Sequence, residues 1–450
     1  MRGLRSTIAL LAVLIGLGAY IYFVVSDAPE SGTTTQERVF AALDGDTIDE
    51  LKVKSESGDT TSVKKDAGAW QMTAPLAVKA NATDIGSITS NLGTLEITRV
   101  VDENPTDLKE YGLDAPRVAI EFKASGDKTY GDFHRLLIGA KSPTGGQVFA
   151  MRDADKRVIL VPGHTDAIFN RSTFDLRDKT LVEIDRQTVD RIAASGNETT
   201  MELGRDVTGW KLTKPMTAIA DPTAADTLLG LVQGATIKSI VAEQATPADL
   251  KKYGFDRPQA TLSLHTGETA TTLVFGGNAS DTDVFVREGS KPLVATADRS
   301  LLEAVQKPAE EYRRKNIFGF SRYSTDRLEF TRDGQTVVLE KVKSQDLTPD
   351  KWRRVSPNAG DPDAMSVDDL LTKLEGLRAT SFLNSTAGTG LDKPSLTVYA
   401  KFENGTKEDR VSFARAVADV HAGIAGQPGA AQVSATEFDE AIKALDLVSK

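Results

Sequence analysis

The stretch Trp70-Gln71-Met72-Thr73-Ala74-Pro75 recurs twice along the chain and organises the whole sequence. Its second copy is WKLTKP at residues 210–215, and its third is WRRVSP at residues 352–357. The sequence contains three tryptophans, and each lies five residues before a proline. Trp70 and Trp210 are 140 residues apart, and Trp210 and Trp352 are 142 apart. A fixed period of this kind predicts a repeated structural unit.

A second segment recurs between the tryptophans. It is YGLDAP at residues 111–116 and YGFDRP at residues 253–258, and the third copy keeps only GLDKP at residues 390–394. Glycine and proline at these positions are typical of a chain that stops a helix and turns. We therefore expect the recurring residues to set cores and turns. This structural repeat signature comprises Trp70, Pro75, Tyr111, Gly112, Pro116, Trp210, Pro215, Tyr253, Gly254, Pro258, Trp352, Pro357, Gly390 and Pro394.

Length and repeat together predict the domain organisation. A chain of 450 residues with 40% hydrophobic content can form about three domains. The predicted order is a membrane anchor (1–26), a flexible tether (27–38), module one (39–185), module two (186–322) and a degenerate, capping module three (323–450). Each module alternates strand-like segments with two or three helical ones. The predicted class is therefore α+β, with antiparallel sheets and packed helices.

Local patterns predict individual elements of the modules. In module one, residues 51–70 predict a two-stranded hairpin that turns at 57–59, and residues 104–116 predict one short helix opened by Pro105. Between them, Thr83 is the predicted N-cap of a longer amphipathic helix. The corresponding helices are expected to begin at Thr223 in module two and, with a capping box of Ser366 and Asp369, in module three.

The N-terminal segment predicts a membrane anchor. Arg2 and Arg5 precede an uncharged run over residues 6–26, whose apolar core is residues 8–25. As a helix these 18 residues would span roughly 27 Å, close to a hydrocarbon core of ~30 Å. The two arginines place the N-terminus in the cytoplasm and the bulk outside it. We expect a single-pass protein of the bacterial inner membrane with a periplasmic body; a cleaved signal peptide is the alternative.

Composition limits the chemistry that the chain can carry. The net charge is -10, and acidic and basic residues are mixed along the chain. Nucleic-acid binding would need a clustered basic face, which the sequence does not show, so we do not predict it. The chain has no cysteine, which excludes disulfides and thiolate metal sites. Its histidines show no metal-ligand spacing, and the acidic loop at residues 44–50 fails the calcium-loop pattern. No catalytic motif is present, so we predict no catalytic, cofactor-binding or metal-binding residues and a protein that is not an enzyme.

A short basic segment closes modules one and two. Arg177 corresponds to Arg313, and Lys179 corresponds to Lys315. We expect these residues to make contacts near a module junction. A site for an anionic partner at Arg177 or Arg313 is the alternative.

The recurring Trp-x4-Pro and Tyr-Gly-Φ-Asp-x-Pro patterns (Φ is apolar), together with LRDK at residues 176–179, carry a family resemblance. The chain resembles a bacterial family described only as domain of unknown function 4340, over nearly the whole exported part. The resemblance implies a membrane-anchored protein encoded beside ABC-transporter components, including permease and auxiliary subunits similar to those of gliding-motility systems. It implies a transporter accessory role and supplies no catalytic residues. Together with the anchor, the repeated modules and the lack of catalytic motifs, it leads us to predict a non-enzymatic scaffold or accessory subunit of an ABC-type transport complex. An envelope protein that binds glycan, lipid or peptide is the alternative, followed by a cryptic hydrolase.

Overall fold

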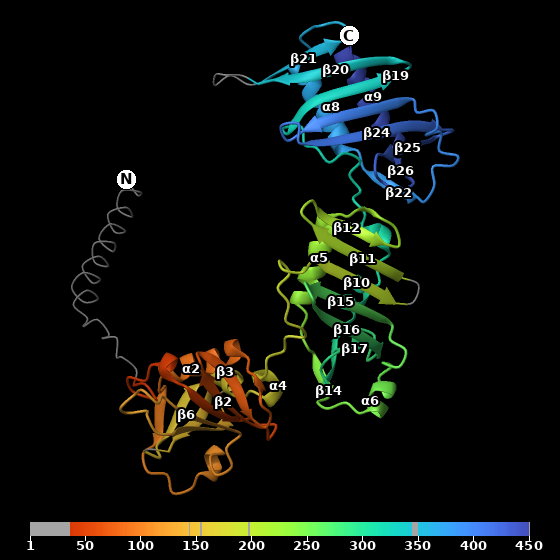
Figure 1. Ribbon diagram of the computed structural model, residues 1–450. Helices are drawn as coiled ribbons and strands as arrows, with labels where there is room; N and C mark the ends of the chain where they lie inside the picture. Colours follow the sequence, from red (N-terminus) through yellow and green to blue (C-terminus); the bar gives the residue numbers. More distant parts are fainter. Residues whose placement is uncertain (1–36, 144, 154, 197–198, 344–349, 450) are drawn as a thin grey trace, which may run out of the picture. The chain divides into compact units, whose positions relative to one another are not determined.

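The computed structural model describes residues 37–143, 145–153, 155–196, 199–343 and 350–449 (Figure 1). These residues form three antiparallel sheets with associated helices, which is an α+β architecture. The chain divides into two compact units between Lys179 and Thr180; the first unit holds one sheet and the second holds two. The predicted anchor and residues 27–36 of the predicted tether lie outside the described residues. Within the described ranges, no helix is long and apolar enough to cross a membrane.

The sheet of module one has nine strands in the order β4-β3-β2-β1-β6-β7-β8-β9-β5, and all neighbours are antiparallel. Its elements are η2 (Gly45–Thr47), β1 (Glu50–Lys54), β2 (Thr60–Asp66), β3 (Ala69–Ala74), β4 (Val78–Lys79), α2 (Ala82–Thr94), β5 (Arg99–Asp102), η3 (Lys109–Tyr111), β6 (Val118–Lys123), β7 (His134–Lys141), β8 (Gln147–Arg152), β9 (Val158–Pro162), α3 (His164–Phe169) and α4 (Thr173–Leu176).

The sheet of module two repeats this order strand for strand, as β13-β12-β11-β10-β15-β16-β17-β18-β14. Its elements are β10 (Arg191–Gly196), β11 (Thr199–Asp206), β12 (Gly209–Lys214), β13 (Ala218–Ile219), α5 (Pro222–Gln233), β14 (Ser239–Ala242), α6 (Pro247–Lys252), β15 (Ala260–Thr266), β16 (Thr269–Asn278), β17 (Asp283–Glu288), β18 (Val294–Asp298), α7 (Arg299–Val305) and η4 (Ala309–Tyr312).

The sheet of module three has eight strands in the order β21-β20-β19-β23-β24-β25-β26-β22. In place of the two short helices that close modules one and two, it ends in the longer helix α9, which packs with α8 in one hydrophobic core. Its elements are β19 (Thr325–Arg332), β20 (Gln335–Val342), β21 (Lys351–Ser356), α8 (Ala364–Gly376), β22 (Ala379–Leu383), β23 (Leu396–Phe402), β24 (Lys407–Ala416), β25 (Asp419–Ile424), β26 (Ala430–Val433) and α9 (Ala435–Ser449).

Each core forms where one face of the sheet meets the helices of its module. In module one the apolar stripe of α2, which includes Ile85, Ile88 and Leu92, is fully buried. It shares a core with alternate residues of the central strands, such as Ile120 and Phe122 of β6. Period 2 in the strands and period 3.6 in the helix therefore place apolar side chains on facing surfaces.

The helix starts differ from those predicted. The N-cap of α2 is Asn81 rather than Thr83, because the Asn81 side chain accepts hydrogen bonds from the backbone N–H groups of Thr83 and Asp84. Asp221 caps α5 in place of Thr223. The predicted capping box of Ser366 and Asp369 is also wrong, because Asp363 caps α8 and its carboxylate accepts from Ser366. In each case a short acidic or amide side chain two or three residues earlier takes the capping role, which such residues fill well.

Two other local predictions also require correction. The predicted hairpin over residues 51–70 is three strands, because the chain turns again at Ala67 and Gly68, both with positive φ, and places Trp70 in β3. The predicted helix over residues 104–116 is only the 3-10 turn η3, and Pro105 lies outside it. In module two the equivalent segment does form a helix, α6, because Thr246 and Asp249 make a capping box there.

Candidate functional site at the module ends

The tryptophan of each Trp-x4-Pro copy lies on strand β3, β12 or β21. Trp70 and Trp210 are buried, and Trp352 is half-buried against the core of module three. A cation on the neighbouring strand lies over each indole ring, at 5.4 Å for Lys65 on Trp70, 5.7 Å for Arg205 on Trp210 and 5.3 Å for Lys341 on Trp352. Such contacts stabilise by about 0.5–1 kcal/mol when partly exposed. A cation therefore covers one face of each indole ring.

The proline of each copy lies where the chain turns back from that strand. The peptide bonds before Pro75, Pro215 and Pro357 are all cis. In modules one and two the returning chain donates a backbone hydrogen bond to the tryptophan carbonyl, from Ala80 at 3.2 Å and from Ala220 at 3.1 Å. The first signature segment therefore builds the same edge turn in modules one and two, with the same proline geometry in all three.

The second signature segment packs against β7 and β8 in module one and against β16 and β17 in module two, and we call it the clamp segment. Gly112, Gly254 and Gly390 all have positive φ, at 63°, 83° and 77°. The carbonyl of Tyr253 then lies against Gly276 of β16, where an added Cβ would come within 2.3 Å of that oxygen. The tyrosine rings pack on a phenylalanine of the sheet, Tyr111 on Phe149 and Tyr253 on Phe285. Pro116, Pro258 and Pro394 each precede the next strand by two residues.

The basic residues that close modules one and two belong to a short segment, residues 176–179 and 312–315, which we call the closing segment. It pairs with the backbone just before the long helix of the same module. In module one Asn81 donates to Leu176 at 2.8 Å, and in module two Asp221 donates to Tyr312 at 2.8 Å. The isolated bridges Ala80–Arg177 and Ala220–Arg313 complete the match. The structure therefore places Arg177 and Arg313 at equivalent positions.

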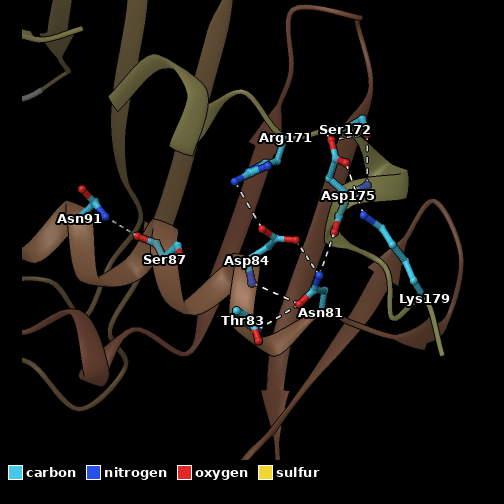
Figure 2. A network of polar contacts seen from close by, with 9 residues as sticks. All are labelled: Asn81, Thr83, Asp84, Ser87, Asn91, Arg171, Ser172, Asp175 and Lys179. Atoms are coloured by element: carbon cyan, nitrogen blue, oxygen red, sulfur yellow. Dashed lines mark hydrogen bonds and ion pairs between the residues drawn. The ribbon is translucent and has the colours of Figure 1, made fainter. Parts of the chain in front are cut away.

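A polar cluster surrounds the start of α2 next to the closing segment, and Figure 2 shows its members. Asp84 accepts a hydrogen bond from Asn81 at 2.6 Å and lies 3.4 Å from Arg171. Lys179 lies 3.6 Å from Asp175. Burial acts to raise the pKa of Asp175, but hydrogen bonds from Ser172 and the nearby Lys179 outweigh it and hold that pKa below its ordinary value. The Asn81 side-chain amide donates to the backbone carbonyl of Asp175 at 3.4 Å, and this hydrogen bond joins the start of α2 to α4.

Module two keeps one pair of this cluster, because Lys315 and Glu311 hold the positions of Lys179 and Asp175. Lys315 lies 2.8 Å from Glu311, and this hydrogen bond holds the pKa of Glu311 below its ordinary value. A groove runs along α5 at this point, and Leu231 in its lining is 44% exposed. The groove is lined by Asp221, Thr223, Ala224, Thr227, Leu228, Leu231, Ala304, Lys307, Glu311, Tyr312, Lys315 and Arg378.

Arg313 is buried where modules two and three meet within the second unit. Only 3% of it is exposed, and its guanidinium stacks on Phe382 with 3.8 Å between Cζ and the ring centroid. Its Nη2 donates to the carbonyl of Pro428 at 3.3 Å, and nearby Gln427 accepts from the backbone N–H of Ile219 at 3.0 Å. Burial lowers the pKa of Arg313, with Glu310 acting in the opposite direction. Nη1 has no hydrogen-bond partner among the described residues.

The remaining candidates take local roles. Throughout the ranges that the structure describes, no three histidine or carboxylate side chains gather in a way that could hold a metal ion. His134 packs in an aromatic cluster, His265 lies 2.9 Å from Arg191, and His421 is buried in β25. The acidic loop at residues 44–50 contains η2, capped by Asp44, and leads into β1.

Sequence reasoning missed the cations that cover the tryptophans and the partners of Arg313. The sequence did contain a signal for two of the cations, because Lys65 and Arg205 both lie five residues before the tryptophan that they cover. Phe382 and Pro428 had no such signal, because they contact Arg313 from more than 60 residues away along the chain.

The closing segment of module two makes a testable contribution to stability at alkaline pH. Burial raises the pKa of Tyr312 to about 12, and its hydroxyl donates to the Ala304 carbonyl at 3.2 Å. An unfolded tyrosine ionises near pH 10, so the folded state should lose about 3 kcal/mol as pH rises from about 10 to 12. Tyr312→Phe should remove this part of the alkaline loss in denaturation curves. The exposed control Tyr323→Phe should keep it, and equal curves for both variants would contradict the assignment.

Together these features define a protein of tandem α+β modules whose recurring residues build edge turns, sheet clamps and module closures. The chain belongs to the family described as Domain of unknown function (DUF4340), whose model matches residues 70–241 and residues 210–394. Both matches begin on a signature tryptophan, Trp70 or Trp210, and run from the third strand of one module into the next module. No curated protein matches the chain.

Proposed function

We propose that the protein is a non-enzymatic, membrane-anchored extracytoplasmic scaffold or accessory subunit of an ABC-type transport complex. An inner-membrane anchor over residues 6–26 and a periplasmic body are part of this proposal. The family resemblance suggests the class of partner, an ABC permease or its auxiliary subunits. Recurring residues that serve packing and turns support a structural role for the modules.

The observation that carries the proposal is the short distance along the chain between the apolar run and module one. The fold of module one already includes Glu37, whose carbonyl accepts from the N–H of Ile97 at 2.8 Å. Ten residues lie between Ser26 and Glu37, and the eleven Cα–Cα steps that connect the two residues span at most about 40 Å when fully extended. An anchor that ends near Ser26 would therefore keep module one within reach of a partner in the same membrane.

Modules two and three add a continuous body to this arrangement. Arg314 donates a backbone hydrogen bond to Ile219 of module two at 3.0 Å, and the next residue, Lys315, accepts one from Ala379 of module three at 2.7 Å. Two consecutive residues therefore bond to the two modules in turn, and both modules belong to one compact unit. A body of this kind suits a scaffold, because two modules joined by backbone hydrogen bonds offer more surface to a partner than one module does.

Crosslinking followed by mass spectrometry on membranes that carry a tagged full-length chain tests the proposal. An ABC permease or auxiliary subunit should be recovered, with links that map to one face of a module. A tagged single-span protein of unrelated body serves as the control for crowding in the membrane. Links to an ABC component no more frequent than in this control would overturn the proposal.

Removal of the anchor makes a separate prediction. A variant that lacks residues 1–26 and carries a cleavable signal should be recovered as a soluble periplasmic protein, because the apolar run that holds it would be gone. Cell fractionation followed by immunoblotting measures this. Retention in the membrane pellet would show that a partner holds the body there, and a band from uncleaved signal must first be excluded by its size.

The groove along α5 favours a second candidate, an envelope protein that binds glycan, lipid or peptide. Its lining includes Leu228, Leu231, Lys307 and Lys315, so it combines apolar and charged contacts. A glycan and lipid binding screen tests this candidate. Binding that is lost in Leu231→Gln but kept in Leu447→Gln, an exposed leucine of α9, would favour it over the scaffold.

A further inference from the structure

A stretch of backbone leads from the signature proline to the long helix of each module, and it follows the same course in all three. We call it the returning segment, residues 78–81, 218–221 and 360–363. Its first residue pairs with the residue two positions after the tryptophan. Its last residue is the N-cap of the long helix, Asn81, Asp221 or Asp363. The three returning segments can therefore be compared position by position.

In modules one and two the closing segment covers the returning segment with two backbone hydrogen bonds. The N-cap residue donates one of them, and the carbonyl two residues before the cap accepts the other. The four bonds are Asn81 to Leu176 and Asp221 to Tyr312 at 2.8 Å, and Asp178 to Lys79 and Arg314 to Ile219 at 3.0 Å. The outward backbone groups of the returning segment are thus paired in both modules.

In module three the corresponding outward groups are the carbonyl of Asp361 and the N–H of Asp363. Neither group forms a hydrogen bond with a residue that the structure describes. Pro362 lies between them and does not interrupt the pattern, because the residue at its position in the other modules turns its N–H inward to the tryptophan carbonyl. A free donor and a free acceptor at a sheet edge form a template for an added strand.

The charge at this edge favours a basic segment. Asp361 and Asp363 are both exposed, and Arg354 of the same edge donates its N–H groups to two backbone carbonyls. The closing segments that cover the other two modules are themselves basic, with the sequences LRDK and YRRK. An extended segment that carries lysine or arginine is therefore complementary to the free edge.

An exposed apolar side chain lies beside the same edge. Met365 is 81% exposed and lies two residues after the N-cap of α8. Thr223 holds this position in module two, where it lines the groove along α5 together with Lys315 of the closing segment. A lysine of an added strand would therefore pack its hydrocarbon stem on Met365 and keep its ammonium group in water.

We propose that the β21 edge of module three binds an extended basic segment of another protein, in the way that the closing segments bind in modules one and two. A carbonyl of the partner segment would accept from the N–H of Asp363. The partner's N–H two residues later would donate to the carbonyl of Asp361. This proposal concerns the mode of contact and does not depend on a transport role for the partner.

Fluorescence anisotropy with a labelled synthetic peptide of residues 311–317, EYRRKNI, tests the edge on the full-length chain in detergent. The peptide should bind with a dissociation constant below about 1 mM. N-methylation of the peptide at Arg314 removes the N–H that would pair with Asp361, so it should weaken binding roughly two- to tenfold. Asp361→Asn should also weaken binding. Asp392→Asn is the matched control, because it removes the same charge from an exposed loop after β22, the opposite edge strand of the sheet.

Hydrogen exchange followed by mass spectrometry locates the bound peptide. Exchange of the Asp363 amide should slow when the peptide is added. Slower exchange of residues 79–81 or 219–221 instead would mean that the peptide replaces a native closing segment, and it would overturn the proposal. Slower exchange of Asp363 on raising the protein concentration alone would make a second copy of the chain the occupant, against the proposal.

The binding curves can contradict the proposal in three further ways. These are the absence of saturable binding, equal affinity of the plain and N-methylated peptides, and equal affinity of Asp361→Asn and Asp392→Asn. If Asp361→Asn fails to fold by circular dichroism, Met365→Thr replaces it, because the other two modules carry threonine at this position. Unchanged affinity in that folded variant counts against the site.

Discussion

Replacing Trp210 by alanine should lower the free energy of unfolding of module two by about 3–5 kcal/mol, the usual cost of removing a large buried aromatic side chain. Trp210 is only 5% exposed and lies under Arg205, so truncation leaves both an unfilled space and a cation without its aromatic partner. The surrounding strands β11 and β12 are hydrogen-bonded along their length and have little freedom to collapse into that space.

Chemical denaturation of the full-length chain in detergent, followed by far-ultraviolet circular dichroism, measures the effect. Trp352→Ala provides the internal comparison, because Trp352 holds the same place in the repeat but is half-buried. Its variant should lose clearly less stability. A loss below about 1 kcal/mol for Trp210→Ala would contradict the core role and return a surface role, such as contact with carbohydrate, to consideration.

The strands and the long helix of each module could be predicted from the periodic spacing of apolar residues. Val118, Ile120 and Phe122 alternate with more polar neighbours, and the structure buries those three in β6. The apolar stripe of α2 was visible for the same reason. These patterns are local consequences of which side chains face the core, so one sequence is enough to find them.

Element boundaries depended on competition between neighbouring polar residues. Asn81 and Thr83 both suit the N-cap of α2, and the structure uses Asn81 because the closing segment also binds its backbone N–H through Leu176. That second contact comes from nearly one hundred residues later in the chain. A choice between two adequate caps was therefore made by tertiary contact, which local propensity does not encode.

Only part of each candidate site could be predicted from the sequence, again because tertiary contacts complete it. The equivalence of Arg177 and Arg313 could be predicted from the repeat, and so could their position near a module end. The different surroundings of Arg177 and Arg313 could not be predicted, because the contacts of Arg313 with Phe382 and Pro428 depend on how module three packs against module two. A sequence repeat predicts the positions that its copies share, but it does not predict the contacts that each copy makes with the rest of the chain.

Replacing Gly276 by alanine should destabilise module two by about 3 kcal/mol, the upper part of the range for forced overpacking. An added Cβ would lie 2.3 Å from the carbonyl oxygen of Tyr253, far inside contact distance. That oxygen is held in place because it accepts a hydrogen bond from the N–H of Gly277 at 2.7 Å. Relief would require the clamp segment to leave the sheet and the ring of Tyr253 to separate from Phe285.

The control and the readout both come from the repeat itself. Gly230→Ala lies in the middle of α5, where the nearest heavy atom to a new Cβ is 3.9 Å away, so it should stabilise module two by roughly 0.5–1 kcal/mol. Because each module contains one tryptophan, a Trp70→Phe/Trp352→Phe background makes fluorescence report on module two through Trp210. If Gly276→Ala and Gly230→Ala shift the fluorescence transition in the same direction, the close approach of Tyr253 to Gly276 does not hold the clamp. The recurrence of Gly-Φ-Asp-x-Pro would then need an explanation other than packing against the sheet.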